Sequence, residues 1–552
     1  MSIRWRSFAS PAIALLALMS SAVGIVNQFT YDDKYVILLN PAAHDLHQWW
    51  RAFAQSYWPK DWGGDGYRPL TILAFKIESV IGGGSPIAFH AANILLYTIA
   101  SLLVFALARR VLPVWAAWIS AALFAVHPVH VEAVANVVGQ SELLVAIVIL
   151  SSTILYLRDR ANGDLQPRTI AAISILYALG CFAKEHAIVL PAVLGIAELT
   201  VIHDPRPFGE RFRKARPTYL LLTAIALAFV GVRSMVLADH GIGGFQPFVP
   251  FATLHISSGD RILTALGVVP EWVRLVFWPV HLSSEYGPPD IEIAQGFSVS
   301  QIPGFLLLLG ILALAVLLRR RERTISFGIA LACIALLPSS NFIVPAGIVL
   351  AERTLFLPSA GAMLAVGGLA VVMLDRVRAR YGNKRSIIRV SWIALGVVLA
   401  AGVARSATRS TVWRDNDTLF RRAVIDAPLS YRAHYMLGAW HFENKRKREG
   451  EAEYRKALHL FPYDPFVSYN MAEQYRNFGL CGAALPLYRW TMSLDPKFPL
   501  GHTSYAMCLL DQGDFDEARA KALEAFRFGG DAKALLRIMF VVDSVRGGGR
   551  HG

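Results

Sequence analysis

The sequence predicts an all-α protein, in which a multi-pass membrane helical bundle is followed by a soluble α-solenoid. Composition is the first observation: 55% of the 552 residues are hydrophobic, 17% are charged, and the mean hydropathy is +0.43, which does not suit a soluble chain of this length. The second is a series of long apolar runs without internal charge, as in membrane helices. The third is a 34-residue period near the C-terminus, typical of stacked helix pairs.

About eleven segments are apolar and long enough to cross a bilayer. The first lies within residues 1–28, after Arg4 and Arg6. This pattern also suits a cleavable signal peptide, but the many later spans favour an uncleaved helix with a cytoplasmic N-terminus. The other expected spans are 87–108, 113–127, 139–157, 168–183, 186–202, 216–237, 301–319, 324–338, 354–374 and 387–404. The first predicted domain is therefore residues 1–410.

A polar and aromatic loop, residues 29–86, follows the first span. It is rich in Trp, which suits the lipid headgroup zone, and residues 68–80 predict a helix at the membrane interface. Asp32 and Asp33 stand at the start of this loop. Carboxylates at a membrane surface are costly unless they are used, so the pair is our leading candidate for chemistry; the alternative is that it only keeps the loop hydrated.

Most Lys and Arg residues lie in short loops between apolar runs, so the net charge of +14 indicates membrane orientation and not nucleic-acid binding. Alternate loops carry them, at 109–110, 158–168, 206–216, 319–323 and 376–389. The positive-inside rule places these loops in the cytoplasm, and loop 29–86 and the C-terminal tail outside it. Residues 259–280 are apolar but contain Pro270, Glu271 and Arg274, so we expect a re-entrant or surface helix on the outer side.

The second predicted domain, residues 411–552, is charged and helical. Pro428, Pro462 and Pro496 are spaced 34 residues apart, and this spacing predicts about three tetratricopeptide (TPR) repeats, at 431–464, 465–498 and 499–532. Because each helix pair buries its apolar face only against its neighbours, the repeats form a short curved array. We expect this array to bind a partner and not to perform chemistry.

The four cysteines do not predict a disulfide framework. Cys181 and Cys333 lie in apolar runs, and Cys481 and Cys508 lie in different repeats, so all four are expected to be small hydrophobic fillers. His127, His130 and Glu132 suggest zinc at first sight, but Pro128 breaks the helical register that a zinc motif needs. No metal site is therefore predicted.

Several polar clusters interrupt the apolar sequence near the outer ends of the spans. They contain Asp32, Asp33, Arg68, His127, His130, Glu132, Gln140, Glu142, Lys184, Glu185, His186, Glu271, Arg274, Glu352 and Arg353. Each cluster alone suits a local ion pair or a helix cap, whereas so many on one face of a membrane suggest a cavity with paired charges.

Glycosyl transfer from a lipid-linked sugar phosphate fits one carboxylate among several cations. The departing phosphate is a stable anion and needs positive charge, a role for Arg68, Lys184, Arg274 and Arg353. The acceptor hydroxyl is a weak nucleophile and needs a general base, a role for Asp32 or Asp33. One base and a departing phosphate predict inversion at the anomeric carbon.

These motifs resemble the transmembrane and TPR-repeat-containing O-mannosyltransferases. The resemblance rests on Asp32-Asp33 after the first span, on Tyr67-Arg68-Pro69-Leu70-Thr71 and Phe89-His90, on His127 to Val134, on Gly139 to Leu144, on Lys184-Glu185, on Ala351-Glu352-Arg353 with Leu357-Pro358-Ser359, and on the TPR tail. It extends over nearly the whole chain in the same order, and the run His127 to Glu132 is its most specific part.

The resemblance implies a glycosyltransferase fold of the GT-C type, a polyprenyl-phosphate sugar donor, commonly mannose, and Ser or Thr of a protein as acceptor. It also implies that Asp32 and Asp33 form the acidic motif, with Asp33 as the base. From the polar clusters we expect the site to be lined by His127, His130, Glu132, Glu142, Glu185, His186 and Glu352. The chain departs from the family pattern at Gln140 and Glu142 and in its short repeat tail, which leave the sugar and the acceptor open. No cofactor is expected, and the need for a divalent cation is left open.

The short tail and terse loops favour a bacterial inner-membrane protein with a periplasmic TPR array and an undecaprenyl-phosphate donor; a eukaryotic protein would lie in the ER membrane. Two other functions fit the sequence. One is transfer to a glycan or lipid acceptor instead of a protein. The other is a non-enzymatic membrane anchor or transporter that carries a TPR scaffold, although transporters often have internal symmetry and the sequence shows none.

Overall fold

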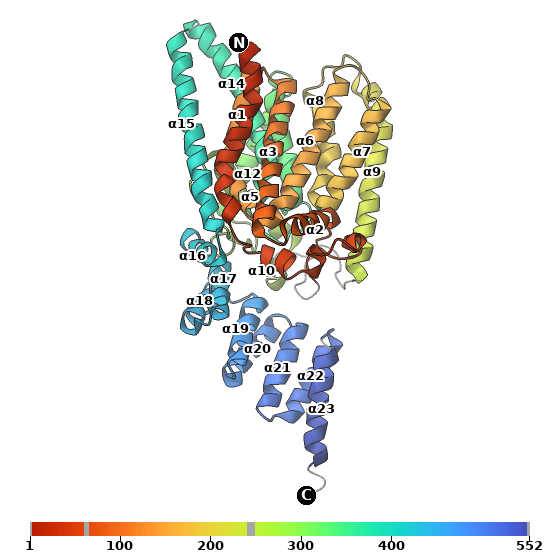
Figure 1. Cartoon of the computed structure of the whole chain (residues 1–552), viewed down its shortest axis with the longest axis vertical. Coiled ribbons are helices and arrows are strands. Elements are labelled where there is room, and N and C mark those ends of the chain that lie inside the picture. The colour runs from red at the N-terminus through yellow and green to blue at the C-terminus, as the bar shows by residue number, and fades with distance from the viewer. Residues whose placement is uncertain (1–2, 60–65, 240–248, 383, 531, 549–552) are drawn as a thin grey trace. The chain divides into compact units, whose positions relative to one another are not determined.

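The structure is a computed structural model that describes residues 3–59, 66–239, 249–382, 384–530 and 532–548. Every regular element in these residues is a helix, so the predicted all-α class is confirmed. The chain forms two compact units (Figure 1). The membrane unit contains Met1–Gln246, Ile262–Ser284 and Phe297–Leu419, and the repeat unit contains Pro247–Arg261, Glu285–Gly296 and Phe420–Gly552.

The long helices of the membrane unit follow the predicted apolar runs. They are α1 (Ile3–Ser21), α3 (Pro86–Val111), α4 (Val114–Ala125), α6 (Gln140–Arg160), α7 (Pro167–Ala183), α8 (Leu190–Thr200), α9 (Phe208–Asp239), α12 (Ile302–Leu318), α13 (Arg323–Leu336), α14 (Phe356–Tyr381) and α15 (Arg385–Ser410). The other α-helices are α2 (Pro69–Gly82), α5 (Val131–Ala135) and most of α11 (Ser258–Phe277).

Short helices connect these elements. They are η1 (Ala22–Val26), the π-helix η2 (Lys34–Leu38), η3 (Pro41–Ala43), η4 (Trp49–Ala54), η6 (Pro128–His130), η7 (Val137–Gly139), η8 (Glu185–Val189), η9 (Val299–Gln301), η10 (Leu337–Ser339), η11 (Glu352–Leu355) and η12 (Thr411–Trp413). Four of them, η6, η7, η8 and η11, interrupt or precede membrane helices and carry the polar motifs.

The number of spans agrees only roughly with the prediction. Seven helices in the described residues are long and apolar enough to cross a membrane, and the bent pair Val114–Ala125 and Pro128–Ala135, with an angle of 48°, makes up to eight. The helices Pro167–Ala183 and Arg323–Ser339 are apolar but shorter, and the expected span 186–202 consists of η8 and α8. All eleven expected segments are thus helical, and the chain is a multi-pass membrane protein.

Two predicted helices outside the spans are present. Residues 68–80 form α2, and residues 259–280 fall on α11, which contains Pro270. Neither helix is among the candidate spans of the described residues. α2 has only 14 residues and is too short to span a bilayer, and α11 contains the charged residues Glu271 and Arg274.

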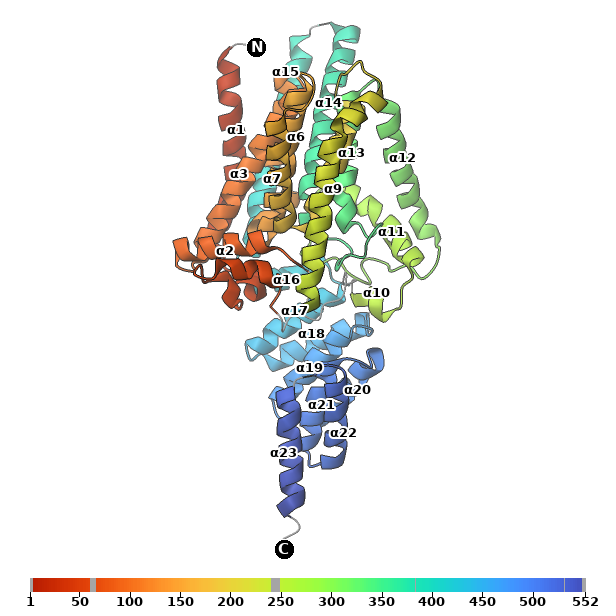
Figure 2. The same ribbon diagram turned by 90° about the vertical axis from the view of Figure 1, so that its right-hand side faces the viewer.

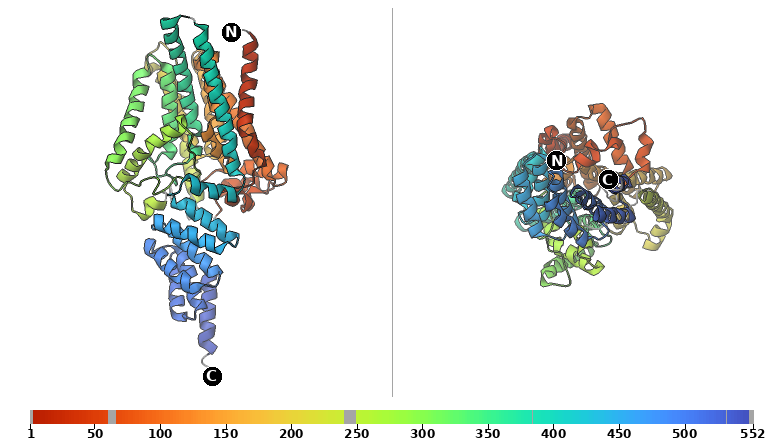
Figure 3. Two further views of the ribbon diagram at one scale, coloured as in Figure 1. Left: turned by 90° about the vertical axis from the view of Figure 1, so that its left-hand side faces the viewer. Right: turned by 90° about the horizontal axis from the view of Figure 1, so that it is seen from below.

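Small residues allow close packing between the membrane helices. A Cβ atom at Gly328 of α13 would lie 2.5 Å from the carbonyl oxygen of Gly361 on α14, and one at Gly361 would lie 2.5 Å from that of Gly328. The two backbones therefore touch at this pair, as is common between membrane helices. On another side of the bundle α1 and α15 run side by side (Figure 3), where the Asn27 side chain donates to the carbonyl of Ser410.

The connections of the membrane unit divide between its two ends. The beginning of α1, the α8–α9 connection and the α14–α15 connection lie at the same end, and α2 lies at the other (Figures 1 and 2). Arg376 to Arg389, at the α14–α15 connection, and Arg206 to Arg216, after α8, therefore share an end. We name it the basic end, and we name the end with α2 the loop end.

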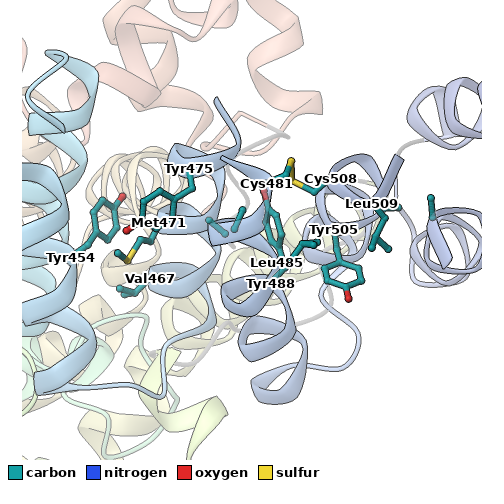
Figure 4. Packing of buried hydrophobic residues seen from close by; sticks show 14 of the residues in the cluster. Tyr454, Val467, Met471, Tyr475, Cys481, Leu485, Tyr488, Tyr505, Cys508 and Leu509 are labelled. Carbon is teal, nitrogen blue, oxygen red and sulfur yellow. A yellow bond between two sulfur atoms is a disulfide. The ribbon is translucent and has the colours of Figure 1, made fainter. Parts of the chain in front are cut away.

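The repeat unit contains the predicted TPR helix pairs. Its helices are part of α16 (Asn416–Asp426), then α17 (Tyr431–Glu443), α18 (Lys447–Leu460), α19 (Pro465–Asn477), α20 (Cys481–Leu494), α21 (Pro499–Asp511), α22 (Phe515–Arg527) and α23 (Ala532–Gly548), with the short α10 (Val249–Thr253). Tyr454 and Tyr488, 34 residues apart, are both fully buried in one core (Figure 4). Position 438 requires glycine, because a Cβ atom there would lie 2.9 Å from the Tyr454 ring.

The prediction that all four cysteines are unpaired fillers is wrong. Cys481 at the start of α20 and Cys508 on α21 form a disulfide with a Cα–Cα distance of 5.3 Å (Figure 4). The two residues are 27 positions apart, so they do not occupy equivalent repeat positions. The second helix of one repeat packs against the first helix of the next, and this neighbourhood, invisible in a self-comparison of the sequence, brings the thiols together. Cys181 and Cys333 are free.

Two segments between α9 and α12 belong to the repeat unit. Glu285 forms an ion pair of 3.0 Å with Arg432 of α17, and the Tyr431 amide donates to the Pro288 carbonyl at 3.3 Å. Leu254 packs against the TPR core. The repeat unit thus contains more than the period-34 sequence, because it also includes parts of the connection that follows α9.

Candidate functional site

The predicted polar motifs coincide with interruptions of the membrane helices. His127 to His130 form the bend into η6, Lys184 and Glu185 lead from α7 into η8, and Glu352 and Arg353 form η11. An interruption leaves backbone N–H groups without helical partners, and this is tolerated at membrane depth only where protein or water supplies replacements. Buried carboxylates supply several of them here.

Asp33 shows this role most clearly. Its side chain is fully buried, and one carboxylate oxygen accepts hydrogen bonds from the amides of Thr30 and Val137, both at 3.2 Å. The other oxygen accepts from the Val138 amide at 2.9 Å. Burial raises the pKa of Asp33 to about 7, although these three bonds act in the opposite direction. Asp33 therefore ties the first loop to η7 and has little room for an acceptor hydroxyl.

Three further carboxylates bind the amide of a distant segment. Glu132 accepts from the Arg353 amide at 2.9 Å, Glu185 from the Tyr67 amide at 3.1 Å, and Glu352 from the Ser283 amide at 2.6 Å. Together with Asp33 we name these residues the clamping carboxylates. Their bonds join segments from 69 to 221 residues apart, so they fix the loop end of the bundle.

Asp32 differs from its neighbour. It is only half-buried, and its charge acts on Arg353, whereas both Asp32 and Asp33 act on the hydroxyl of Tyr57. Asp32 is thus the more accessible of the two carboxylates, whereas Asp33 is bonded to the backbone of η7.

Three ion pairs bring most of the predicted cations together with predicted carboxylates. The guanidinium of Arg68 contacts Glu185 at 3.1 Å. Lys184 contacts Glu142 of α6, and Arg353 contacts Glu132. The ring of His186 lies 3.4 Å from the second oxygen of Glu142. The side chains of Lys184, Glu142 and Glu132 are nearly inaccessible to solvent. About one-fifth of each of the other side chains is exposed, namely Arg68, Glu185, His186 and Arg353.

The charges of these pairs act on one another, which indicates one shared site. Burial lowers the pKa of Lys184 to about 8; Glu142 raises it, and the positive charges of Arg68 and Arg353 lower it further. Burial raises the pKa of Glu185, but Arg68 and two amide hydrogen bonds outweigh burial and bring it to about 2. Cations from α2, the end of α7 and η11 therefore share the loop end.

The two histidines of the most specific motif are held by the protein core. His127 contacts the Val276 carbonyl through Nε2 at 2.7 Å and accepts from the Val129 amide through Nδ1 at 3.2 Å. His130 contacts Ser359 through Nε2 at 2.7 Å and the Tyr97 hydroxyl through Nδ1 at 3.2 Å. Both nitrogens of both rings are engaged, so these residues fix helix packing and do not face the charged site.

Arg274 is also engaged locally. It pairs with Glu271 of the same helix, and it donates to the His281 carbonyl at 2.9 Å. These bonds close the end of α11. Within the described residues no group of three or more His, Cys, Asp or Glu side chains has a geometry suited to a metal ion.

Tyr57 is a site residue that the sequence analysis missed. Its ring lies under the guanidinium of Arg68, 4.7 Å from the ring centroid, and its side chain is 1% exposed. The only sequence signal was its place in the Trp-rich loop, where many aromatic residues are expected. Chemically, the loop end offers the half-buried carboxylate of Asp32, one buried and two partly buried cations with their paired carboxylates, and a phenol.

Comparisons with known proteins support the two-part organisation. A family model described as tetratricopeptide repeat matches residues 417–465 and 469–532. The chain is 24% identical over 498 residues to the mouse protein named Protein O-mannosyl-transferase TMTC3, covering 85% of this chain and 53% of the relative. It is 28% identical over 482 residues to mouse Protein O-mannosyl-transferase TMTC4, covering 78% and 63%.

The chain thus spans little more than half the length of the curated relatives it matches. A shorter match, 39% identical over 271 residues, joins 47% of this chain to 28% of the Drosophila melanogaster Protein O-mannosyl-transferase Tmtc2. Among solved structures, the oligosaccharyltransferase AglB of Archaeoglobus fulgidus aligns over 84% of this chain and 60% of its own at 15% identity, with a TM-score of 0.41. The relatives confirm the resemblance that the motifs indicated.

Proposed function

Because this chain is related to the transmembrane and TPR-repeat-containing O-mannosyltransferases, we propose that it is a membrane glycosyltransferase. It transfers a sugar, mannose or another hexose, from a polyprenyl-phosphate donor to Ser or Thr of an acceptor protein outside the cytoplasm. The observation that carries this proposal is the gathering of three cations and one half-buried carboxylate at the loop end. The proposal includes the GT-C type of fold.

We assign the general base to Asp32 and not, as the sequence suggested, to Asp33. The base must reach the acceptor hydroxyl. Both oxygens of Asp33 are held by backbone amides in a fully buried position, whereas Asp32 is half-buried and acts on the charged site. Asp33 instead accepts hydrogen bonds that fix the loop segment next to Asp32.

In the reaction, the acceptor oxygen forms a bond to the anomeric carbon as its proton passes to Asp32. The bond from that carbon to the phosphate oxygen breaks on the opposite face, and the polyprenyl phosphate leaves with the electron pair. Arg68, Lys184 and Arg353 stabilise the negative charge on the leaving phosphate. Attack opposite the leaving group inverts the anomeric configuration.

The ion pairs suggest how these cations are kept ready. Each is paired with a carboxylate, Glu185, Glu142 or Glu132. A buried cation without a partner is strongly unfavourable, so the carboxylates hold the cations in place until the phosphate adds a further negative charge. Glu142 and His186 belong to this supporting set, and Arg274 does not.

Two independent observations support an orientation of the chain in the membrane. The basic end carries the arginine-rich connections, which the positive-inside rule assigns to the cytoplasm, and α15 begins at that end and leads to the repeat unit. The repeat unit contains the Cys481–Cys508 disulfide, and disulfides persist in oxidising compartments. We propose that the N-terminus is cytoplasmic and that the loop end and the TPR array face the periplasm or the ER lumen. There the array recruits the acceptor protein.

Transfer of a radiolabelled sugar from polyprenyl phosphate by the detergent-purified protein tests the function, with wild type beside Asp32→Asn and Asp33→Asn. We expect Asp32→Asn to lose about 10²- to 10⁴-fold in kcat while it still binds the donor. Asp33→Asn is the matched variant, because it is the neighbouring residue with the same change. It is expected to lower the unfolding temperature more and kcat less.

Equal loss of kcat in the two variants, with equal stability, would remove the assignment of Asp32. If wild type neither binds nor turns over any lipid-linked sugar, the enzyme proposal fails, and a TPR scaffold on a membrane anchor becomes the better interpretation. A preference for a glycan or lipid acceptor over Ser- and Thr-containing peptides would correct the acceptor alone.

A further inference from the structure

Tyr57 occupies a special position at the loop end. It follows η4, and its amide donates to the Gly66 carbonyl at 2.8 Å. Its ring belongs to a buried core with Phe75, Val137 and Val138, beside the segment whose amides bind Asp33. The face of the ring supports the Arg68 guanidinium, a cation–π contact that fixes both groups.

The hydroxyl of Tyr57 is buried and has no hydrogen-bond partner among the described residues. Buried polar atoms nearly always have a partner, and an exception calls for an explanation such as a missing ligand. Tyr67 provides a contrast in the same loop, because its hydroxyl is satisfied by the Phe53 carbonyl at 2.8 Å. A phenylalanine would fill the position of Tyr57 without the cost of an unsatisfied hydroxyl, so among the described residues the oxygen is left available to a ligand.

Charged side chains of both signs act on the hydroxyl of Tyr57. Burial raises the pKa of Tyr57; Arg68 and Arg353 lower it, and Asp32 and Asp33 raise it. The hydroxyl therefore stays protonated at neutral pH and is a hydrogen-bond donor. Arg68, which we assign to the phosphate, lies over the same ring, 4.7 Å from its centroid.

We propose that the Tyr57 hydroxyl donates a hydrogen bond to a phosphate oxygen of the polyprenyl-phosphate donor. This inference rests on the proposed function and adds a binding residue to it. A neutral donor adds no charge to a site whose three cations are already balanced by three carboxylates. Hydrogen bonds to charged acceptors are also the stronger ones, so the phosphate is a better partner than a sugar hydroxyl.

The test is Tyr57→Phe, which keeps the ring and its contact with Arg68 and removes only the oxygen. Two quantities are measured on the full-length protein in detergent. One is the Kd of undecaprenyl phosphate without sugar, and the other is kcat/KM for transfer from the sugar-bearing lipid. We expect each to worsen about 10- to 100-fold, with an unchanged or higher unfolding temperature, because no hydrogen bond to a described residue is lost.

Tyr67→Phe is the matched control in the same loop. It removes a hydroxyl that has a partner in the protein, so it should lower the unfolding temperature and leave the Kd of undecaprenyl phosphate unchanged. The proposal is wrong if Tyr57→Phe binds undecaprenyl phosphate as well as wild type does. An effect confined to the sugar-bearing lipid would assign Tyr57 to the sugar and likewise overturn it.

The failure of this inference can be told from that of the proposed function. If wild type transfers sugar and Tyr57→Phe equals it in both quantities, only the role of Tyr57 falls. If wild type binds neither lipid, the polyprenyl-phosphate donor itself is wrong, and the role of Tyr57 falls with it.

Discussion

The two units of this protein use charged side chains in different ways. In the repeat unit, His434 contacts the Pro428 carbonyl at 2.9 Å and Glu453 at 2.5 Å. Sixty-eight residues later, or two repeats, His502 contacts the Pro496 carbonyl at 2.9 Å and Glu524 at 3.3 Å. The contact between the histidine and the proline carbonyl thus occurs at equivalent positions of the first and third repeats, whereas Ser468 takes this position in the second.

The membrane unit contains no such recurrence among its described residues. Each of the pairs Arg68–Glu185, Lys184–Glu142 and Arg353–Glu132 joins different elements, and all three lie in one region. A charge pair that repeats with the architecture is explained by the architecture. Pairs that occur once, buried together at the end of a membrane bundle, need another explanation, and we find it in the substrate.

The largest effect should come from breaking one of these buried pairs. Glu132→Gln leaves Arg353 without its anionic partner, and we expect a loss of about 3–5 kcal/mol in the stability of the membrane unit. Thermal unfolding in detergent measures it. Asp426→Asn in the repeat unit is the control, because its partner Arg422 is 49% exposed, and its cost should stay near 0.5 kcal/mol. Equal losses in the two variants would remove the contrast between the units.

The next effect concerns the disulfide of the repeat unit. Cys508→Ser opens a loop defined by a separation of 27 residues, which should cost about 3–4 kcal/mol of repeat-unit stability. Limited proteolysis with and without a reductant reports it. Cys333→Ser, at a free cysteine of the membrane unit, should make no difference to proteolysis of the TPR helices.

Thiol labelling of the same cysteines sharpens the proposed orientation. In sealed vesicles whose outer surface is the proposed non-cytoplasmic face, a membrane-impermeant maleimide added outside should label Cys481 and Cys508 only after reduction. Labelling without any reductant would mean that the Cys481–Cys508 disulfide does not form. The disulfide would then no longer support an oxidising compartment for the repeat unit.

A smaller effect is a pH dependence in the repeat unit. Burial raises the pKa of Glu453, but hydrogen bonds from His434 and Lys456 outweigh it and lower the pKa to about 2. Because the folded value lies below the unfolded value of about 4.5, the pair stabilises the fold above pH 4.5, and this stability is lost as the pH falls towards 2. The loss should be roughly 1–3 kcal/mol. In Glu453→Gln the decline between pH 4.5 and 2 should be smaller, and an unchanged decline would contradict this assignment.

Much of the fold could be predicted because it depends on periodic or compositional signals. Apolar runs gave all eleven helical segments, and the prolines at 428, 462 and 496 gave the repeats. The bend after α4 could be anticipated at Pro128, since proline lacks the amide that a continuing helix needs. The shorter α8 and α13 could not be distinguished from full spans, because composition does not report where a helix ends in three-dimensional space.

The site was predictable in its residues but not in its pairings. The sequence analysis placed Asp32, Asp33, Arg68, Lys184 and Arg353 on the outer side of the membrane. Only the structure shows that the amides of Val137 and Val138 donate hydrogen bonds to the Asp33 carboxylate. Pairings such as Glu132 with Arg353 join residues 221 positions apart, and no local pattern encodes them. The disulfide and the unsatisfied hydroxyl of Tyr57 were missed for the same reason.

The clamping carboxylates also bear on how the protein is made. The partner of Asp33 at Val137 and the partner of Glu132 at Arg353 are synthesised later than the carboxylates themselves. For Glu185 the order is reversed, because its partner Tyr67 is synthesised first. During co-translational insertion the early helices therefore enter the bilayer with carboxylates whose final partners do not yet exist. The last of these partners arrives with η11 and α14. Membrane biogenesis of this chain thus has a defined finishing step, and a ribosome stalled before residue 352 would leave an open, protease-sensitive bundle.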